Sequence, residues 1–288
     1  MDVPVGRKKH VAPTPLMGGI VLLGAFAPVA LIYIIALASG TWISSLLIWL
    51  SSFFVMALVG LADDRHSLSP RLRLIISFAV FATAIAVDPT FTVRVLDLNI
   101  TPLTLGLGTR WSAMVFTVIC CVGLLNAVNM ADGKNGLVLG LALGWLAILA
   151  IRAVDPLLPL IGLFAGVLMV LFAFNMRGRL FLGDGGAYAI ATAISLLAIM
   201  VYNTPGTHAL RAISADEVAS LFLVPVADSF RLIYKRLRQG RSPMSADRDH
   251  LHHHLQDKFG WPGGLVIYLV IALSISGFFI LVSRLRTH

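Results

Sequence analysis

Charged residues are scarce in this sequence, and cysteine is almost absent. Asp, Glu, Lys and Arg make up only 12% of the 288 residues, against roughly 25% in soluble domains, while 58% are hydrophobic. This balance leaves no room for a separate soluble domain. The two cysteines, Cys120 and Cys121, are adjacent within an apolar run, so they cannot form an ordinary disulfide with each other. With no further cysteine to complete a metal site, we interpret them as small core residues.

Long apolar runs dominate what remains. The hydrocarbon core of a membrane is about 30 Å thick, so a helix needs roughly 20 apolar residues to cross it. The sequence therefore predicts an all-α polytopic membrane protein, a single integral membrane domain over residues 1–288, with short strands within 91–105. Nine transmembrane helices are predicted at 17–38, 44–62, 71–88, 112–130, 136–153, 157–175, 186–203, 217–235 and 264–284.

The basic residues predict the orientation of these helices. With a cytoplasmic N-terminus, 16 of the 22 Lys and Arg residues lie on the cytoplasmic face and 6 on the other. The polar, Pro-containing N-terminal segment lacks the pattern of a cleaved signal peptide. The net charge of +8 is explained by this bias and by anionic lipid, so we expect no nucleic-acid partner.

Every second polar gap between the apolar runs gathers acidic, basic and histidine residues. Alternate gaps of a membrane bundle lie on the same face, so these gaps are predicted to meet in the cytoplasm. Carboxylates, imidazoles and guanidinium groups together suggest a site for a charged substrate, with a metal ion. The cytoplasmic motifs lie near residues 7–19, 60–73, 126–137, 177–188 and 236–263.

Two adjacent acids, Asp63 and Asp64, end the second predicted helix. A helix C-terminus carries partial negative charge, so acids are unfavourable there. One interpretation is a solvated pair neutralised by Arg65. We favour a site for a divalent cation or phosphate, because adjacent carboxylates repel each other unless a cation offsets them.

Asp132 and Asp184 each precede a predicted helix, where Asp is a common N-cap. Capping is therefore one interpretation of both. Asn126 and Asn129, three residues apart on one helical face, precede Asp132. Asp184 is flanked by glycines in FLGDGG, and glycine-rich turns at helix N-termini make anion sites. A metal that bridges such a carboxylate to phosphate is the second interpretation.

Asp228 lies within an apolar run, with Arg231 three residues later and Pro225 three residues before. An acid inside a membrane segment suggests function, but pairing with Arg231 explains it equally well. We expect Pro225 to kink or break this helix.

Four histidines lie within residues 250–254, close to Arg241 in the sequence. A zinc site, a solvated loop and a phosphate-binding cluster are all consistent with this composition. Arginine favours the last because its guanidinium group binds phosphate through two contacts.

Five segments in this order resemble the polyprenyl-phosphate N-acetylhexosamine-1-phosphate transferase family: RKKHVAPTPLMGG, ADDRHSLSPRLRL, NAVNMADGKNGL, FLGDGG and RSPMSADRDHLHHH. The resemblance spans residues 7–254. It implies transfer of a sugar 1-phosphate from a UDP-sugar to undecaprenyl phosphate, releasing UMP, with Mg²⁺ or alternatively Mn²⁺. It further implies a bacterial inner-membrane enzyme that starts cell-envelope polysaccharide synthesis, and related enzymes suggest a homodimer.

The resemblance also implies roles for individual residues by their place in the motifs. Asp63, Asp64 and Asp132 are implied as catalytic, and Asp184, Asp63 and Asp64 as metal ligands. Phe181 matches an aromatic that stacks on uracil. The implied substrate-binding residues are Lys8, Asn126, Asn129, Asn135, Phe181, Arg241, His250, His252 and His253.

Three departures from the family pattern stand out. Asn135 replaces an Asp that many members carry, and Ala187 replaces a Ser. The printed sequence also begins at the first motif, whereas members usually have a span before it. The histidine segment is more similar to the branch that transfers N-acetylglucosamine than to the branch that transfers N-acetylmuramoyl-pentapeptide. GalNAc and deoxy-sugar donors remain open, as do a membrane lipid-phosphate hydrolase and an anion transporter.

Overall fold

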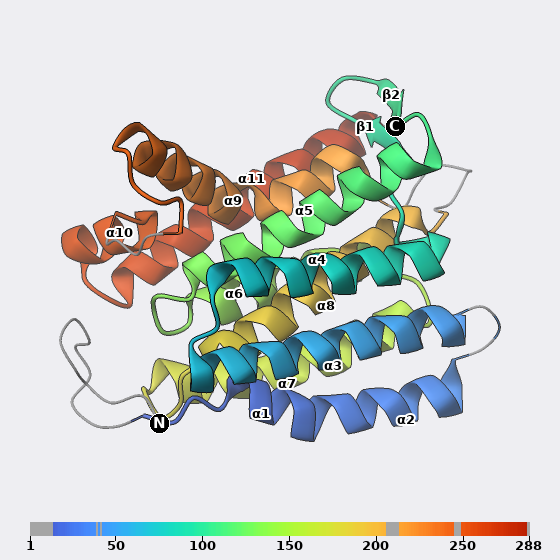
Figure 1. The fold of residues 1–288 in the computed structure, drawn as a ribbon. Helices are drawn as coiled ribbons and strands as arrows, with labels where there is room; N and C mark the ends of the chain where they lie inside the picture. Colours follow the sequence, from blue (N-terminus) through green and yellow to red (C-terminus); the bar gives the residue numbers. More distant parts are fainter. Residues whose placement is uncertain (1–13, 39, 41, 206–212, 245–248, 287–288) are drawn as a thin grey trace.

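The computed structural model describes residues 14–38, 40, 42–205, 213–244 and 249–286 (Figure 1). Helices account for most of this part of the chain. The elements are α1 (Gly18–Val21), η1 (Leu22–Phe26), α2 (Ala27–Leu37), α3 (Trp42–His66), α4 (Pro70–Val87), η2 (Pro89–Phe91), β1 (Val95–Leu98), β2 (Leu103–Gly106), α5 (Arg110–Ala131), α6 (Leu137–Arg152), α7 (Leu157–Met176), α8 (Gly183–Asn203), α9 (Ala215–Arg238), α10 (Leu251–Phe259) and α11 (Gly263–Arg286).

The prediction of a helical polytopic membrane protein is confirmed, and each of the nine predicted segments overlaps a helix. In the part of the chain that the structure describes, seven helices are long and apolar enough to cross a membrane; the first of them is the continuous stretch of α1, η1 and α2. Apolar α6 is shorter, at 16 residues. The remaining predicted span is α9, which is 24 residues long and carries charged residues in its first and last turns.

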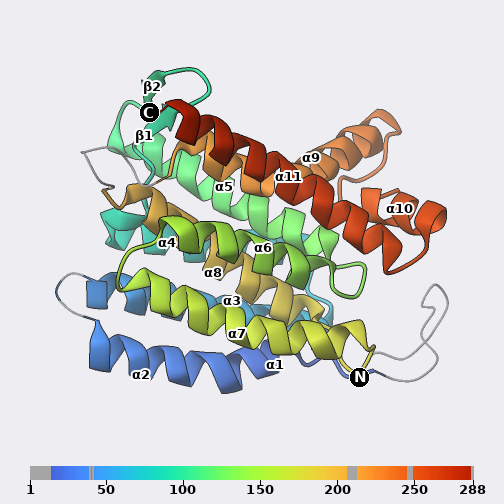
Figure 2. The ribbon, with the colours of Figure 1, turned by 180° about the vertical axis from the view of Figure 1, so that it is seen from behind.

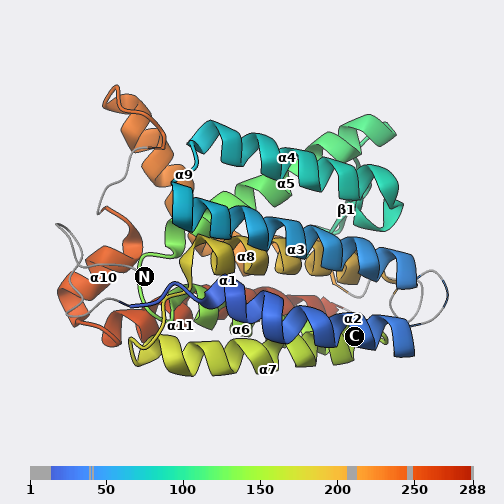
Figure 3. The ribbon, with the colours of Figure 1, turned by 60° about the horizontal axis from the view of Figure 1, so that its bottom comes forward.

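The central element of the bundle is α8, which lies between α3 on one side and α6 and α7 on the other (Figures 2 and 3). Every residue from Gly185 to Tyr202 is buried. Its sequence explains this position, because apolar and small residues surround the whole helix and leave no polar face for solvent. Small residues also let neighbouring helices approach closely inside a membrane.

The closest approach joins α3 to the start of α8. A Cβ atom on Gly60 would lie 2.3 Å from the main-chain oxygen of Asp184 and 2.5 Å from the Cα of Gly185. On the other side, a Cβ on Gly18 would lie 2.3 Å from the main-chain oxygen of Leu182. Only glycine fits these positions, so the backbones of α1, α3 and α8 meet directly where the acidic motifs lie.

An aromatic cluster holds the other end of α3. The Phe26 ring lies edge-on to Phe53 at 5.4 Å and is tilted against Phe164 at 4.6 Å. Trp49 stacks on Phe53 and donates its indole N–H to the main-chain oxygen of Ala193 in α8 (3.0 Å). Such ring pairs contribute roughly 0.5–1.5 kcal/mol beyond their buried area. They fix η1, α3, α7 and α8 relative to one another.

The predicted strands form a two-stranded antiparallel hairpin, with Val95 opposite Gly106. Hairpin and C-terminus lie at one end of the bundle, and α10 lies at the other (Figure 1). The carboxylate of Asp216 in α9 accepts hydrogen bonds from the main-chain N–H groups of Asn99 and Ile100 at 2.9 and 2.8 Å. These contacts fasten the hairpin turn to α9.

Two smaller expectations need correction: the core position of Cys120 and, of the kink or break expected at Pro225, the break. Cys121 is buried as predicted, but Cys120 is exposed on α5, because adjacent helical residues face different directions. Pro225 does not break its helix: α9 continues through it from Ala215 to Arg238. Proline is tolerated inside membrane helices where neighbouring groups satisfy the freed carbonyl.

The crossing of α3 and α8 gives a first prediction. We expect Gly60→Ala to lower the free energy of unfolding by about 1–3 kcal/mol, because the added methyl group meets main-chain atoms that cannot move aside. Thermal unfolding in detergent would measure the change. Gly123→Ala on α5 is the matched control, since a Cβ there meets no heavy atom within 4 Å. Equal melting temperatures for the two variants would contradict the prediction.

Candidate functional site

Asp64 caps a helix other than its own. Its Oδ1 accepts the main-chain N–H of Asp184 (2.9 Å), and its Oδ2 accepts that of Gly185 (3.0 Å). The first turn of any helix has N–H groups without helical partners and carries partial positive charge. At the start of α8 no residue of the helix itself provides a side-chain cap. The carboxylate at the C-terminal end of α3 supplies one, which explains an acid in an otherwise unfavourable position.

Asp63 points into the protein and is only 5% exposed. Its Oδ2 accepts hydrogen bonds from Arg73 (2.8 Å) and from the hydroxyl of Tyr188 (2.9 Å), while Oδ1 accepts the N–H of Leu68 (2.8 Å). The interpretation of a solvated pair neutralised by Arg65 is therefore wrong for Asp63. Its partners come from α4 and α8, so this carboxylate ties three segments together.

Asp184 lies in the first turn of α8, where the helix dipole favours an acid. Asp132 does not cap the following helix. It is the C-cap of α5, and Gly136 occupies the N-cap of α6 with a φ of 81°. The interpretation of Asp132 as an N-cap is therefore wrong. A negative charge after a helix C-terminus is unfavourable, so a compensating partner is expected for this group.

The carboxylates of Asp132, Asp184 and Asp64 lie near one another. Burial, with the neighbouring charges of Asp184 and Asp64, raises the pKa of the Asp132 carboxyl group to about 8. The side chain of Asp132 nevertheless keeps part of its surface exposed. Asp64, Asp132 and Asp184 are more than 50 positions apart in the sequence. The fold thus brings them together in a partly exposed site at the end of the bundle.

The turn between α5 and α6 is held by a residue that sequence reasoning missed. Asn175 of α7 accepts the N–H of Gly136 (2.5 Å) and donates to the main-chain oxygen of Leu180 (2.9 Å). The indole N–H of Trp261 donates to the main-chain oxygen of Asn135 (3.0 Å). The motif at 126–137 is therefore locked against the motif at 177–188.

The segment before α1 pairs with the FLGDGG motif through its main chain. Leu16 and Phe181 form an isolated parallel bridge. The N–H of Phe181 donates to the oxygen of Pro15 (3.0 Å), and the N–H of Met17 donates to the oxygen of Phe181 (3.2 Å). The side chain of Phe181 is half-buried.

The histidine segment begins α10 and packs its rings together. His250 and His252 stack at 5.2 Å, and the rings of His252 and His253 lie 4.4 Å apart. His252 is 1% exposed, and its Nε2 has no hydrogen-bond partner among the residues that the structure describes. A Cβ on Gly133 would lie 2.7 Å from that Nε2, so His252 faces the turn that follows Asp132.

His252 is neutral at physiological pH. Burial, followed by the neighbouring His253 and His250, lowers the pKa of its imidazole to about 3. A neutral imidazole has one N–H donor and one acceptor nitrogen. Its Nε2 is therefore a polar atom that is buried against the turn at Gly133 and makes no hydrogen bond to the described residues.

The other predicted residues occupy less central positions. Asn126 donates to the main-chain oxygen of Val122 within its own helix (2.8 Å). Asn129 is half-buried on α5, and Arg241 is exposed beyond the end of α9. Lys8 lies outside the described residues.

The residues that sequence reasoning missed share one property: each has at least one hydrogen-bond partner between 39 and 126 positions away in the chain. Arg73, Tyr188, Asn175 and Trp261 all support the motifs from other elements. The signal available was the rarity of polar groups inside apolar runs, which marks Asn175 as unusual. Nothing in the local sequence indicates which group each of them contacts.

The donor set fits magnesium, the ion that the resemblance implies. Mg²⁺ prefers oxygen ligands and usually binds one or two carboxylates, several waters and substrate phosphates. Within the described ranges, no group of three or more His, Cys, Asp or Glu side chains is arranged to hold a metal unaided. Asp132 and Asp184 still supply carboxylates of the right kind, and a cation would offset the burial and the repulsion by Asp184 and Asp64 that raise the pKa of Asp132.

Comparisons with known proteins bear on the family of this chain rather than on single residues of the site. A sequence profile described as glycosyl transferase family 4 matches residues 46–202, the stretch from α3 to α8. The decaprenyl-phosphate N-acetylglucosaminephosphotransferase of Mycobacterium leprae (strain TN) is 33% identical over 280 residues, covering 88% of this chain and 69% of that protein. The undecaprenyl-phosphate alpha-N-acetylglucosaminyl 1-phosphate transferase of Salmonella typhi is 30% identical over 269 residues, covering 88% and 68%. A probable undecaprenyl-phosphate N-acetylglucosaminyl 1-phosphate transferase of Bacillus subtilis (strain 168) is 29% identical over 283 residues, covering 94% and 74%.

The raised pKa of Asp132 predicts a pH effect on stability. Between pH about 4 and about 8 the native carboxyl group keeps a proton that the unfolded chain has released. The free energy of unfolding should therefore fall as the pH rises through this window in the absence of divalent cations. Asp132→Asn should flatten the fall, and Mg²⁺ added at pH 8 should reduce it in the wild type. Melting temperatures with a chelator or with Mg²⁺ would test this; an identical pH profile for Asp132→Asn would count against it.

Proposed function

The chain belongs to glycosyl transferase family 4, and we propose that it transfers N-acetylglucosamine 1-phosphate from UDP-N-acetylglucosamine to undecaprenyl phosphate, releasing UMP. Its enzyme class, a sugar-1-phosphate transferase of polysaccharide biosynthesis, follows from this membership. The particular sugar and lipid, and the initiation of a cell-envelope polysaccharide, are the proposal. The names of the relatives from Salmonella and Bacillus support both substrates.

One observation carries the proposal. Acidic side chains from three separate segments meet at the end of the bundle, next to a neutral histidine that has an unpartnered nitrogen. Main-chain N–H groups at the start of α8 lie in the same place, where they hold the carboxylate of Asp64. Carboxylates beside imidazoles suit a metal-bound diphosphate.

The proposed reaction is an in-line displacement. An oxygen of the lipid phosphate attacks the β-phosphorus of the nucleotide-sugar, the bond to the α-phosphate breaks, and UMP leaves. A phosphate monoester with a second pKa near 6 is mostly dianionic at neutral pH, so it hardly needs a base. The protein must instead align two phosphates that repel each other.

The residues of the chain fit this task better than proton abstraction. Asp63 already accepts three hydrogen bonds, so it fixes the shape of the site. Asp64 holds the start of α8, and with it the carboxylate of Asp184. Asp132 and Asp184 would hold Mg²⁺, which supplies charge screening for the diphosphate when bound.

The remaining predicted roles concern the nucleotide-sugar. His252 would present its Nε2 to a phosphate or sugar oxygen without carrying a positive charge. Phe181 would stack on uracil. His250, His253 and Arg241 would surround the diphosphate, and Asn126, Asn129 and Asn135 would complete the polar lining.

We further propose that the site faces the cytoplasm of a bacterial inner membrane and that residues 1–288 form one transferase domain. The uneven distribution of Lys and Arg supports this orientation. A site at the helix ends meets both substrates, because the lipid phosphate lies at the membrane surface and the nucleotide-sugar is dissolved in the cytosol.

The test is a reconstituted transfer reaction. Purified protein in detergent, undecaprenyl phosphate, Mg²⁺ and radiolabelled UDP-GlcNAc should yield UMP and a lipid-linked sugar phosphate only when both substrates are present. Parallel reactions with UDP-GalNAc and UDP-linked deoxy-sugars would decide the donor. Release of phosphate from the lipid alone would indicate a hydrolase instead, and absence of any lipid-linked product would contradict the proposal.

Asp64→Asn gives a sharper prediction within the same assay. We expect kcat to fall at least about 100-fold, since asparagine accepts only one of the two N–H groups and no longer fixes the start of α8 with the carboxylate of Asp184. Stability should fall by only about 1 kcal/mol, because asparagine still accepts one of the two N–H groups. Thermal unfolding of the same preparation separates the two effects. Near-normal turnover would remove Asp64 from the site.

A further inference from the structure

A second buried carboxylate, Asp228, lies near the histidine segment and has no part in the arrangement described above. It is 9% exposed within α9. Its Oδ2 lies 3.1 Å from Nδ1 of His250, and both its oxygens accept the main-chain N–H of Leu251, at 3.2 and 3.3 Å. On its own helix, Arg231 donates to Oδ1 through Nη2 (2.8 Å) and Nε (3.1 Å).

These contacts place Asp228 at the start of α10. Leu251 is the first residue of that helix, and its N–H group has no helical acceptor. The residue at the N-cap, His250, provides no side-chain cap of its own. Asp228 therefore plays for α10 the part that Asp64 plays for α8: a carboxylate from one helix caps the N-terminus of another.

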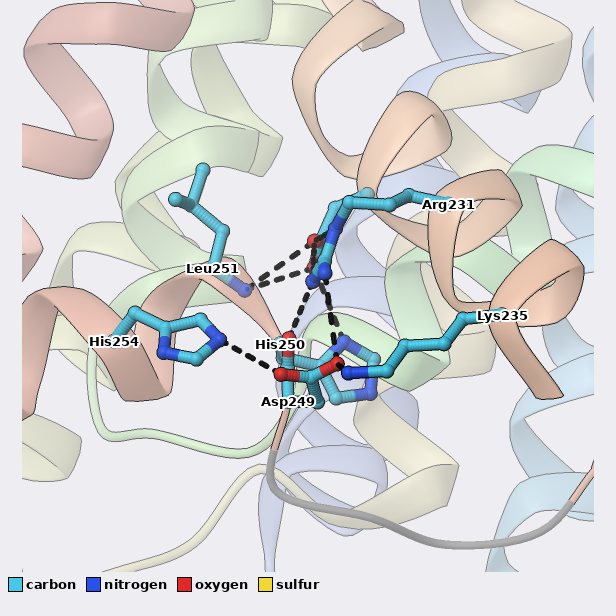
Figure 4. Close-up of polar contacts among 7 residues, drawn as sticks. Arg231, Lys235, Asp249, His250, Leu251 and His254 are labelled. Atoms are coloured by element: carbon cyan, nitrogen blue, oxygen red, sulfur yellow. Dashed lines mark hydrogen bonds and ion pairs between the residues drawn. The ribbon is translucent and has the colours of Figure 1, made fainter. Parts of the chain in front are cut away.

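A second layer of charges reinforces this junction (Figure 4). Asp249 accepts a hydrogen bond from Lys235 (2.5 Å) and lies 2.9 Å from Nε2 of His254. Arg231 also donates to the main-chain oxygen of Asp249. These side chains are more exposed than Asp228, so each pair contributes little by itself. Together they hold the segment that enters α10 against the end of α9.

The junction reaches the candidate site through stacked rings. His250 stacks on His252 with an angle of 15° between the ring planes, and His252 faces the turn at Gly133 beside Asp132. A displacement of the His250 ring would therefore also displace the ring of His252, the neutral histidine whose Nε2 has no partner among the described residues.

We propose that Asp228 is a positioning residue for sugar-phosphate transfer: it holds His250 with a proton on Nδ1 and fixes the start of α10, so that His250 and His252 face the turn after Asp132. This inference rests on the proposed function. Hydrogen bonding to one ring nitrogen selects the tautomer of a histidine and the direction of its other nitrogen. With Nδ1 occupied by Asp228, Nε2 of His250 is the nitrogen left for substrate.

The cost of burying a carboxylate supports a specific role. A buried charge is expensive unless hydrogen bonds and an opposite charge satisfy it. Pairing with Arg231, the simpler of the two sequence interpretations, accounts for Oδ1 alone, whereas Oδ2 contacts the main-chain N–H of Leu251 and Nδ1 of His250. The second oxygen is thus directed at the histidine segment.

A double-mutant cycle tests the positioning role. Asp228→Asn should lower kcat/KM by about 10- to 100-fold, the range found when partners that orient ligand-binding histidines are removed. In a His250→Gln background the same substitution should cost less than about 3-fold, because the ring that Asp228 orients is gone. An equal loss in both backgrounds would show that Asp228 acts on folding alone and would overturn the proposal.

Asp216→Asn is the matched control. Asp216 lies on the same helix and also accepts two main-chain N–H groups, but at the opposite end of the bundle. This variant should keep kcat/KM within about 3-fold of the wild type while changing thermal stability by an amount similar to Asp228→Asn. A loss of activity as large as that of Asp228→Asn would mean that loosening any contact made by α9 reduces turnover, and it would overturn the positioning role.

The histidine tautomer gives a readout that does not need activity. In protein labelled with ¹⁵N at histidine, the His250 signals, identified by their loss in His250→Gln, should report a proton on Nδ1. Asp228→Leu should shift the proton toward Nε2 or average the two forms, while Asp216→Asn leaves the signals unchanged. Unaltered His250 signals in Asp228→Leu would refute the positioning role. If the transfer assay fails but the tautomer depends on Asp228, the proposed function is wrong and the contact is real.

Discussion

The interaction on which the site depends is a carboxylate of one helix that caps the N-terminus of another. Asp64 on α3 binds the first N–H groups of α8, and Asp228 on α9 binds the first N–H group of α10. Each cap satisfies groups that would otherwise be unpaired at the edge of a membrane, where lost hydrogen bonds are costly. Each also fixes where the next acidic or histidine side chain points. The glycine contacts at Gly60 exist because this capping requires the two backbones to touch.

Much of the fold could be predicted from the sequence, because membrane insertion acts on local composition. A long run of apolar residues predicts a membrane-spanning helix, and alternate polar gaps between such runs are predicted to lie on the same face of the membrane. The meeting of Asp64, Asp132 and Asp184 was predictable for the same reason. The partner of Asp63 was not: the neighbouring Arg65 was the obvious candidate, but Arg73 binds it because the start of α4 folds back over the end of α3.

Helix boundaries also limited the prediction of the site. Asp132 followed by glycines reads as the start of a helix, yet α6 begins five residues later, at Leu137. The residues 132–136 form a turn that Asn175 and Trp261, from distant elements, help to hold in place. Sequence patterns describe single elements well, whereas hydrogen bonds between elements depend on how the bundle assembles. The residues that support the site act almost entirely through hydrogen bonds between elements.

The pairing of residues 15–18 with Phe181 has a consequence for how this region can vary between relatives. Its hydrogen bonds join main-chain atoms only, so they do not depend on which side chains are present. Point substitutions of Pro15, Leu16 and Met17 should therefore be tolerated widely, whereas Gly18 is in tight contact with Leu182. An insertion or deletion of one residue would instead move every following partner by one position. The number of residues between Pro15 and Gly18 is therefore more strongly constrained than their identity.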